Sequence, residues 1–563
     1  MHGQSVAKPA GGSAVADGVF LVGVTALSAV PYLTGLGFYS DDYAFLATLT
    51  QTEPQTFRAL LHGLLESPNL APRPLQAAYL AILYQAFGLS PLPGHVVNHV
   101  VFAAGILSFN AGLRRLGLPR FACVALPLIF ASLPHYATDR FWLATHQITL
   151  SMALFFLAFY ASARFAEAPG VGRWPWLLLA AAAMLASLMA YETFAPLFLL
   201  VPAIAWLPRA LHFDPRPRLD LRRHPWLWPF LVHVCVFGAI ALAAFLAKVE
   251  IYGEDRLWHG DAAHWIGAMT WLIKGVLRAA FLDQGVMLPM GVATLLRDHW
   301  RPEAALIALA GFAAISAYLL AVRRRSFQPW RRWQVLALGG FGLLVFFAGY
   351  AAFANNFRIG FSPTGLANRV SMAAGVGVAM IALSCAFLVE GLLPVRWRRW
   401  GAPLLVSVGC SLGVLINGTL GVLWGEAAQV QRSVLAQLRA NLPELPAHTT
   451  LLLDGVCPFV GPGPVFESFW DLRGALQILY ADPSLQADVV KPNVRVGESA
   501  ITTTLYDTLL RHYPYGRLLV YNVRQGKAWQ LTDYPSALGY FSAFDPAESA
   551  GCVFEDGGGV RVY

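Results

Sequence analysis

Two adjacent carboxylates are the most promising chemical groups in this sequence. Asp41 and Asp42 lie in the segment GFYSDDYAF, directly after an apolar stretch. Removing a carboxylate from water is costly, and two neighbouring carboxylates repel each other, which favours a raised pKa. The pair could act as a general base or hold a divalent metal ion such as Mg²⁺ or Mn²⁺. The alternative is that it only ends a helix with polar residues.

Further ionisable residues follow the ends of later apolar runs. Asp139 and Arg140 come after one run, and Glu192 after another. Ionisable groups close to a membrane are candidates for function. His95 and His99 are four residues apart on one predicted helix face, a spacing that suits a metal ion. The alternative for the two histidines is polar lining of a cavity or packing.

Several arginines could bind a phosphate group. A guanidinium can donate two parallel hydrogen bonds to phosphate oxygens. We expect this role for Arg73, Arg358 and Arg369, of which the last two lie in the loop NNFRIGFSPTGLANRV. The alternative for each arginine is a contact with a lipid head group or with the protein surface.

The composition indicates that a membrane bundle positions these residues. Hydrophobic residues make up 57% of the 563 residues and charged residues only 13%, about half the charged content of a soluble chain. This excludes a soluble enzyme, a disordered protein and a disulfide-rich scaffold. Apolar runs long enough to cross a bilayer predict about eleven spans, near 18–38, 92–113, 120–135, 141–163, 174–190, 193–208, 226–248, 303–322, 334–354, 370–392 and 401–424.

The distribution of arginine predicts the orientation. Every second loop is a short basic cluster, as in RRLGLPR and RRRSFQPWRR, and such loops face the cytoplasm. The formal charge of +8 therefore reflects membrane topology and does not predict nucleic-acid binding. We expect a cytoplasmic tail at 1–17, a transmembrane domain at 18–424 with outer loops 39–91 and 249–302, and an outer domain at 425–563.

The outer segments have patterns of their own. Apolar residues at helical spacing in 54–68 and 264–281 predict amphipathic helices lying in the membrane surface; the alternative is ordinary packing on protein. The tail reads as an α/β domain, with helices near 425–442 and 468–481, strands at 449–455 and 517–523, and hairpins at 524–527 and 557–559. Outside the cytoplasm, Cys457 and Cys552 favour a disulfide. The other four cysteines lie in spans and are expected to pack there.

The chain resembles the GT-C superfamily of membrane glycosyltransferases. The resemblance covers roughly 20–210 and rests on FYSDDYAF, RPLQAAYLAILYQAFGLSPLPGHVVNHV, RRLGLPR and SLMAYETFAP. It implies an all-α bundle with an outer C-terminal domain, and a polyprenyl-phosphate sugar as donor. It also implies that Asp41 or Asp42 is the general base, and that Asp139 and Glu192, at later span ends, support a metal or the acceptor. The sequence lacks the DxD and WWD-type motifs of the oligosaccharyltransferase branch.

Together these features predict an inverting glycosyltransferase in the bacterial inner membrane. It would move a sugar to an envelope glycan, lipid or protein acceptor on the outer face, with Arg140, His95 and His99 as further support for acceptor or metal. The alternatives are a transporter or flippase for a lipid-linked glycan, a non-catalytic assembly protein, and a glycan polymerase or ligase. The sugar, the acceptor and the oligomeric state stay open.

Overall fold

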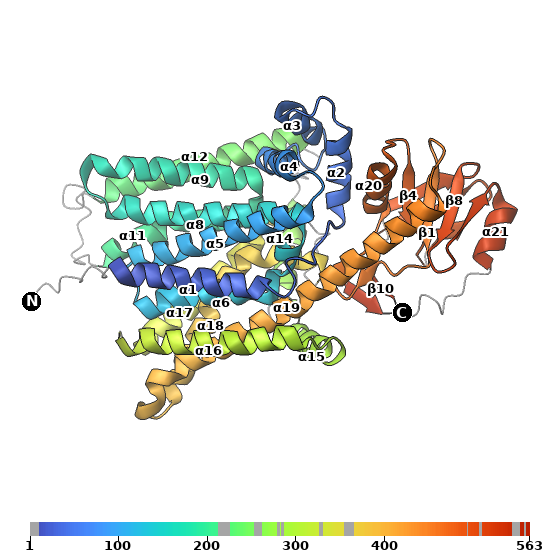
Figure 1. Cartoon of the computed structure of the whole chain (residues 1–563). Helices are drawn as coiled ribbons and strands as arrows, with labels where there is room; N and C mark the ends of the chain where they lie inside the picture. Colours follow the sequence, from blue (N-terminus) through green and yellow to red (C-terminus); the bar gives the residue numbers. More distant parts are fainter. Residues whose placement is uncertain are drawn as a thin grey trace, which may run out of the picture.

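The computed structural model consists of a helical bundle and a smaller domain of strands and helices at one end of it (Figure 1). It describes residues 11–211, 226–252, 262–278, 282, 286–325, 330–353, 365–491, 494–505, 509–542, 552–556 and 559–562. Arg358, one of the predicted phosphate ligands, lies outside the described residues.

Eight helical stretches in the described part of the chain are long and apolar enough to cross a membrane, so this is a multi-pass membrane protein. They contain the helices α5 (Pro91–Arg115), α8 (His146–Glu167), α9 (Trp174–Ala190), α12 (Leu227–Tyr252), α16 (Pro302–Arg325), α17 (Arg332–Ala351), α18 (Met372–Leu392) and α19 (Val395–Asn441). Shorter apolar helices are α1 (Gly11–Ala29) and α6 (Arg120–Ser132). The predicted span at 193–208 is divided into α10 (Ala195–Phe198) and α11 (Val201–Leu211). Each of the eleven predicted spans thus corresponds to a helix or a divided helix.

Two predicted boundaries were wrong. The first span does not run to residue 38, because α1 ends at Ala29 and a stretch without regular helix precedes Asp41. The helix expected at 425–442 is not separate from the last span: α19 continues through both for 47 residues, about 70 Å at 1.5 Å per residue. Figure 1 shows α19 leaving the bundle and reaching the C-terminal domain.

Glycine allows two of the spans to pack closely. A Cβ on Gly377 of α18 would lie 2.4 Å from the carbonyl oxygen of Gly342 on α17, and one on Gly349 would lie 2.4 Å from the Ala374 nitrogen. Membrane helices gain little from burying apolar surface against each other, so close backbone approach at small residues is a main source of their association. The α17–α18 pair therefore depends on these glycines.

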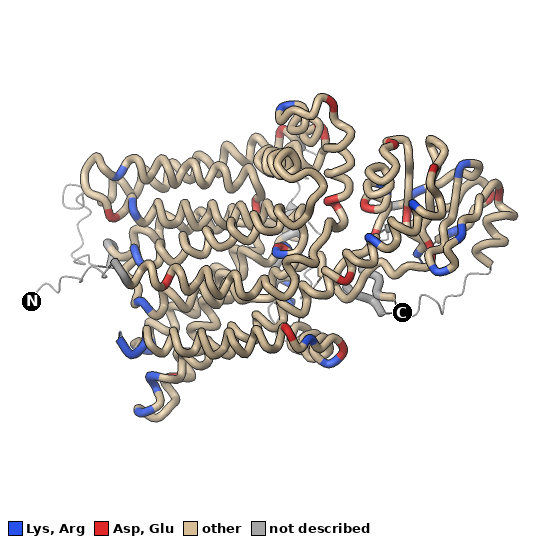
Figure 2. Tube along the Cα trace, viewed as in Figure 1, with Lys and Arg blue, Asp and Glu red and all other residues tan. Residues whose placement is uncertain are grey.

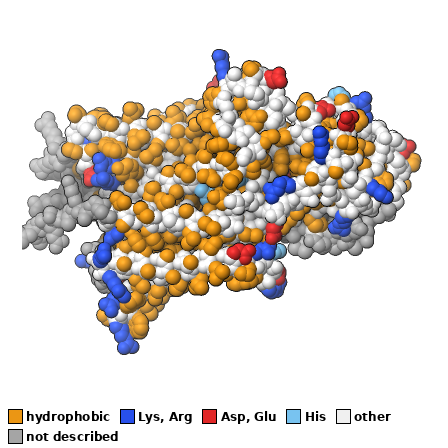
Figure 3. All heavy atoms as spheres, in the orientation of Figure 1, with side chains coloured by type: hydrophobic (Ala, Val, Ile, Leu, Met, Phe, Trp, Pro, Cys, Tyr) orange, Lys and Arg blue, Asp and Glu red, His pale blue; other side chains and the backbone are white. Residues whose placement is uncertain are grey.

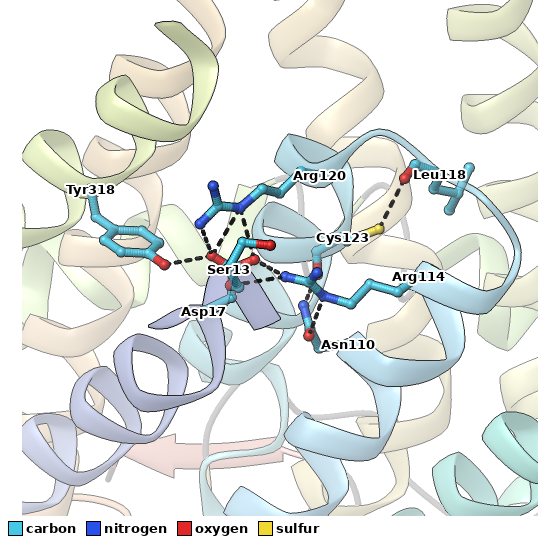
Figure 4. A network of polar contacts seen from close by, with 8 residues as sticks. All are labelled: Ser13, Asp17, Asn110, Arg114, Leu118, Arg120, Cys123 and Tyr318. Atoms are coloured by element: carbon cyan, nitrogen blue, oxygen red, sulfur yellow. Dashed lines mark hydrogen bonds and ion pairs between the residues drawn. The ribbon is translucent and has the colours of Figure 1, made fainter. Parts of the chain in front are cut away.

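A buried acid joins four helices at one end of the bundle (Figure 4). Asp17 of α1 is fully buried, and its carboxylate accepts hydrogen bonds from Arg114 of α5, Arg120 of α6 and Tyr318 of α16. The Arg120 Nη2 atom lies 2.7 Å from Asp17 Oδ1. Lys and Arg collect at this end of the bundle, and the C-terminal domain lies at the other (Figure 2). Apolar side chains cover the flank between the two ends (Figure 3).

Short helices cover the end of the bundle that faces the C-terminal domain. They include α2 (Asp41–Gln51), α3 (Phe57–Leu65), α4 (Pro74–Phe87), α7 (Thr138–Phe141), α14 (Ala262–Leu277) and α15 (Leu288–Asp298). The predicted helix at 54–68 is α3, whose Leu60 and Leu64 are buried in a cluster with Leu80 of α4. Protein thus covers the apolar side of α3. The predicted helix at 264–281 is largely α14.

The C-terminal domain contains a four-stranded mixed sheet in the order β4-β1-β8-β9. Strand β1 (Thr450–Asp454) is parallel to β4 (Gln486–Val489) and β8 (Leu518–Asn522), and β9 (Lys527–Leu531) is antiparallel to β8. Two short strands, β2 (Phe459–Val460) and β3 (Gly463–Pro464), follow β1 and pair with each other. A separate sheet consists of β5 (Arg495–Val496), β6 (Ala500–Leu505) and β7 (Leu509–Pro514). Strand β10 (Val553–Asp556) pairs with β11 (Gly559–Val562). The remaining helices are α20 (Phe469–Tyr480) and α21 (Tyr534–Ser542). A disulfide joins Cys457 and Cys552, as the sequence predicts.

The C-terminal domain is docked onto α2 through α20. A Cβ on Gly474 would lie 2.4 Å from the Tyr43 carbonyl oxygen, so the two helices approach at backbone distance. Gln431 of α19 donates to the Val465 carbonyl at 2.6 Å. These contacts hold the start of α20 against the start of α2, where the two adjacent aspartates lie.

Candidate active site

The two adjacent aspartates have different environments. Asp42 is buried, and its carboxylate accepts hydrogen bonds from the backbone N–H groups of Tyr39 at 2.9 Å and Ala144 at 2.6 Å. Burial raises its pKa well above the ordinary value despite these bonds. Asp42 therefore ties the start of α2 to the turn Leu143–Thr145. These hydrogen bonds hold the backbone of the two segments together.

Asp41 is the member of the pair that is available for chemistry. It is half-buried, and it accepts no hydrogen bond from the residues that the structure describes. Burial raises the pKa of its carboxyl, and the positive charge of Arg369 partly offsets this rise. A carboxylate with a raised pKa and a free oxygen is suited to accept a proton.

The residue before the pair has an unusual backbone. Ser40 has φ 45°, a region that costs a non-glycine residue energy and that is found more often at functional sites. Its side chain donates a hydrogen bond to Glu467 of the C-terminal domain, and the Trp470 indole nitrogen lies 3.4 Å from the Ser40 oxygen. The C-terminal domain thus holds the backbone that presents Asp41.

Asp139 brings a second acid from α7. Its side chain is fully buried, and neither carboxylate oxygen has a hydrogen-bond partner among the described residues. The Asp139 carbonyl oxygen, in contrast, accepts from Asn98 at 3.0 Å and from Thr149 at 3.3 Å. Burial raises the pKa of the carboxyl well above its usual range, against the charges of Arg369 and Arg140. A buried acid without partners calls for a functional reason.

Glu467 brings a third acid from the segment before α20. It is 3% exposed, and burial raises its pKa to about 6. The hydrogen bond from Ser40 and the charges of Lys491 and Arg369 act in the opposite direction, and the charge of Asp41 adds to the rise. Asp471 accepts the Glu467 backbone N–H at 2.7 Å. The turn that carries Glu467 is thereby fixed.

Arg369 is the cation that these acids share. Its charge lowers the pKa of Asp41, Asp139 and Glu467, so all three carboxyls lie within its electrostatic reach. The guanidinium carbon lies 5.0 Å from the centre of the Trp142 ring, and the Trp142 indole donates to the Tyr39 carbonyl at 2.8 Å. Three acids from distant segments therefore lie within electrostatic range of one half-buried arginine, although none of the described acids forms an ion pair with it.

A second ionic cluster lies at the end of α9. Arg73 donates two hydrogen bonds to Glu192, from Nε at 3.1 Å and Nη2 at 3.3 Å, and its guanidinium lies 4.4 Å from the Tyr191 ring centre. Lys248 of α12 lies 3.3 Å from Glu192 Oε1. Burial raises the Glu192 pKa, but Arg73 and Lys248 outweigh it and bring the pKa to about 2. The cluster carries two cations and one anion.

The two histidines face the protein interior. His95 Nε2 lies 3.0 Å from the Gly37 carbonyl oxygen. His99 Nδ1 lies 2.8 Å from the His95 carbonyl, and Nε2 lies 3.2 Å from the Tyr32 hydroxyl. No group of three or more metal-binding side chains forms among the described residues. The role predicted for His95 and His99 in supporting acceptor or metal stays a prediction.

Arg140 points into the bundle, and its charge also acts on the neighbouring Asp139. Its Nη2 donates to the Ala131 carbonyl, and its guanidinium lies 4.9 Å from the Phe102 ring centre and 5.6 Å from that of Tyr136. The sequence placed Arg140 at a span end but could not show which way the side chain points. Arg140 packs between aromatic rings of the bundle.

Comparison with known proteins gives structural neighbours only. The sequence matches no family profile and no curated protein. Two solved structures of ArnT from Cupriavidus metallidurans are similar over most of the chain. The one bound to undecaprenyl phosphate has 16% identity and a TM-score of 0.37, with coverage of 84% of this chain and 85% of ArnT. The apo structure has 15% identity and a TM-score of 0.33, with coverage of 79% and 83%.

At this identity and TM-score the likeness carries no conclusion about activity or ligands.

Two residues of the site were missing from the sequence predictions. Glu467 precedes a predicted helix start, FESFWD, but lies 427 residues from its partner Ser40. Lys248 is the last residue of a predicted span and was not singled out. The only available signal for Lys248 was a charge at a span end on the predicted outer side, the criterion that had selected Glu192.

Proposed function

We propose that this protein is an inverting glycosyltransferase that uses a polyprenyl-phosphate sugar as donor. The observation that supports the proposal is that Asp41 accepts no hydrogen bond from the described residues and, like Asp139 and Glu467, lies within electrostatic range of Arg369. The site lies where the bundle meets the C-terminal domain, and the proposal requires that a lipid-borne donor reach it from the bilayer and an acceptor from the aqueous side. We infer that this side is the outer face of the inner membrane, because the basic loops lie at the opposite end of the bundle.

The proposed reaction is a single displacement at the anomeric carbon. An acceptor hydroxyl forms a bond to this carbon as the bond from the carbon to the phosphate oxygen breaks. The hydroxyl proton passes to Asp41, and the polyprenyl phosphate leaves with the bonding electron pair. No covalent enzyme intermediate is needed, and the configuration of the anomeric carbon inverts.

Arg369 and the Arg73–Glu192–Lys248 cluster supply the positive charge that a departing phosphate needs. Arg369 is half-buried, so its charge is less screened than it would be in water. In the second cluster, Arg73 and Lys248 both pair with Glu192, so two cations lie beside one acid. We assign Arg369 to the phosphate beside the reacting carbon. The Arg73 cluster is a second docking point for the lipid phosphate.

Asp139 and Glu467 complete the acceptor side of the site. Asp139 has two unpaired oxygens that can accept hydrogen bonds from sugar or acceptor hydroxyls. Glu467 holds Ser40 and thereby orients Asp41, so it is a positioning residue. The described side chains do not form a metal site with three or more ligands, and no step of the proposed reaction uses a metal.

The test compares the neighbouring variants Asp41→Asn and Asp42→Asn. Lipid-linked sugars and envelope glycans are measured by mass spectrometry in cells that have or lack the protein, and the donor that accumulates without it is used in vitro. We expect Asp41→Asn to insert and fold normally and to lose sugar transfer. Asp42→Asn should lower thermal stability, because Asp42 binds two backbone N–H groups.

Full transfer activity in Asp41→Asn would refute the assignment of the base. An unchanged set of lipid-linked sugars and glycans in cells without the protein would refute the transferase proposal, and altered transmembrane distribution of an intact lipid-linked glycan would favour the flippase alternative. Undecaprenyl phosphate, which one of the similar structures contains, serves as the test lipid for product inhibition. Arg369→Ala should weaken that inhibition.

A further inference from the structure

A large apolar cavity lies in the bundle away from the proposed active site. Its volume is about 720 Å³, within the range of small-molecule pockets. Helices α5, α8, α11, α17 and α18 contribute to its lining. Gln334 is the single amide side chain among the described residues that line it, and the others are apolar, aromatic or glycine.

The depth of the cavity matches one leaflet of a bilayer. On α17 its lining extends from Trp333 to Val345, a rise of about 18 Å at 1.5 Å per residue. Half the thickness of the hydrocarbon core is about 15 Å. The lining also includes the turn Leu116–Pro119 between α5 and α6, which belongs to the basic end of the bundle. The cavity thus begins at this end and stops near the bundle centre.

Packed aromatic residues separate the cavity from the proposed active site. Beyond Val345, Phe346 and Tyr350 form a buried cluster with Val370, the neighbour of Arg369. The Tyr350 hydroxyl donates to Ser371 at 3.0 Å. The acids around Arg369 therefore lie beyond this cluster, and the cavity is a site of its own.

Two arginines give the cavity entrance a positive charge. Arg331 and Arg332 are exposed and stand between Trp330 and Trp333, which both line the cavity. Tryptophan is typical of the boundary between hydrocarbon and head groups, and arginine beside it attracts anionic head groups. The entrance therefore suits a head group with a negative charge, and the interior suits its hydrocarbon chain.

We propose that the cavity holds an acyl chain of an anionic phospholipid from the leaflet at the basic end of the bundle. The head group lies beside Arg331 and Arg332, and the chain follows α17 inward. This inference does not depend on the proposed transferase activity, because it uses none of the residues around Arg369.

Photo-crosslinking of the full-length protein in nanodiscs tests the proposal. The probe is phosphatidylglycerol with a diazirine near the end of one acyl chain, and phosphatidylcholine with the same chain is the comparison. We expect phosphatidylglycerol to label peptides of α11 and α17 that line the cavity, more strongly than phosphatidylcholine. Ala337→Trp, which fills the cavity, should remove this labelling. Ala317→Trp, on the exposed side of α16, should leave it unchanged.

Loss of both entrance charges should abolish the preference between the two lipids. The variant with Arg331→Gln and Arg332→Gln tests this, with Arg398→Gln at the same end of the bundle as control. Labelling that is equal in Ala337→Trp and the wild-type protein would overturn the proposal, as would displacement of the probe by undecaprenyl phosphate. If Ala337→Trp does not fold, the smaller change Ala337→Leu serves, and undiminished labelling in that folded variant would also count against the site.

Discussion

The variant Glu467→Gln tests whether the C-terminal domain buries an acid at the membrane junction. Glu467 is 3% exposed, and burial raises its pKa from 4.5 to about 6. A carboxyl whose pKa is higher in the folded than in the unfolded protein favours folding in its protonated form. This stabilisation is complete below pH 4.5 and is lost as the pH rises through about 6.

The size of the effect follows from the two pKa values. The difference between 4.5 and about 6 corresponds to a free energy of about 2 kcal/mol. At neutral pH the ionised side chain therefore destabilises the folded protein by about 2 kcal/mol relative to the protonated one. Glutamine has the same shape and carries no charge. We expect Glu467→Gln to be more stable than the wild-type protein by about 2 kcal/mol above about pH 7, with little difference below pH 4.5.

The assay is the thermal unfolding midpoint of the purified protein in detergent, measured in steps of pH across this window. Glu498→Gln is the matched control, because Glu498 is an exposed glutamate of the same domain. The wild-type protein and the control should lose stability together as the pH rises through about 6, and Glu467→Gln should lose less. A wild-type pH profile in Glu467→Gln would show that Glu467 is not buried against Ser40 as described.

Other substitutions separate docking from bundle stability. Gly474→Val should force α20 away from α2, because its Cβ would lie 2.4 Å from the Tyr43 carbonyl oxygen. Transfer activity should then fall, with membrane insertion intact. Gly539→Val is the control and should keep activity, because no atom lies within 4 Å of a Cβ at Gly539. Asp17→Asn should leave Arg114 and Arg120 without their shared acid. The free energy of unfolding should fall by about 3–5 kcal/mol, the typical penalty for breaking a buried ion pair. An unchanged unfolding midpoint would contradict the network in Figure 4.

Hydropathy predicted the bundle because the membrane imposes a local requirement on each span. A run of about 20 apolar residues satisfies its backbone by forming a helix, whatever its neighbours are. The errors concerned two boundaries. The apolar pattern ends near residue 424, so it could not show that α19 continues without a break to Asn441. The end of α1 at Ala29 did have a local signal that the prediction missed, because Pro31 follows two residues later and helices commonly end before a proline.

The candidate site was partly predictable because acids at span ends are rare and therefore conspicuous. Asp41 and Asp139 were found in this way, whereas Arg369 was selected as an arginine in the loop before a predicted span. The different roles of Asp41 and Asp42 could not be found, since they depend on the Ala144 backbone N–H, 102 residues away. Glu467 was missed for the same reason: its importance comes from Ser40, which only the docked C-terminal domain brings within reach.

The site is shared between two parts of the chain, and the connection between them explains how it can be ordered. A flexible linker would have to pay the entropy of closing a loop before Glu467 could meet Ser40. The continuous helix α19 removes most of that freedom, because it extends from the bundle directly into the domain. Tyr39, three residues before Asp42, donates a hydrogen bond from its hydroxyl to the Trp424 carbonyl on this helix at 2.8 Å. The same helix therefore supports both the segment that presents Asp41 and the domain that supplies Glu467.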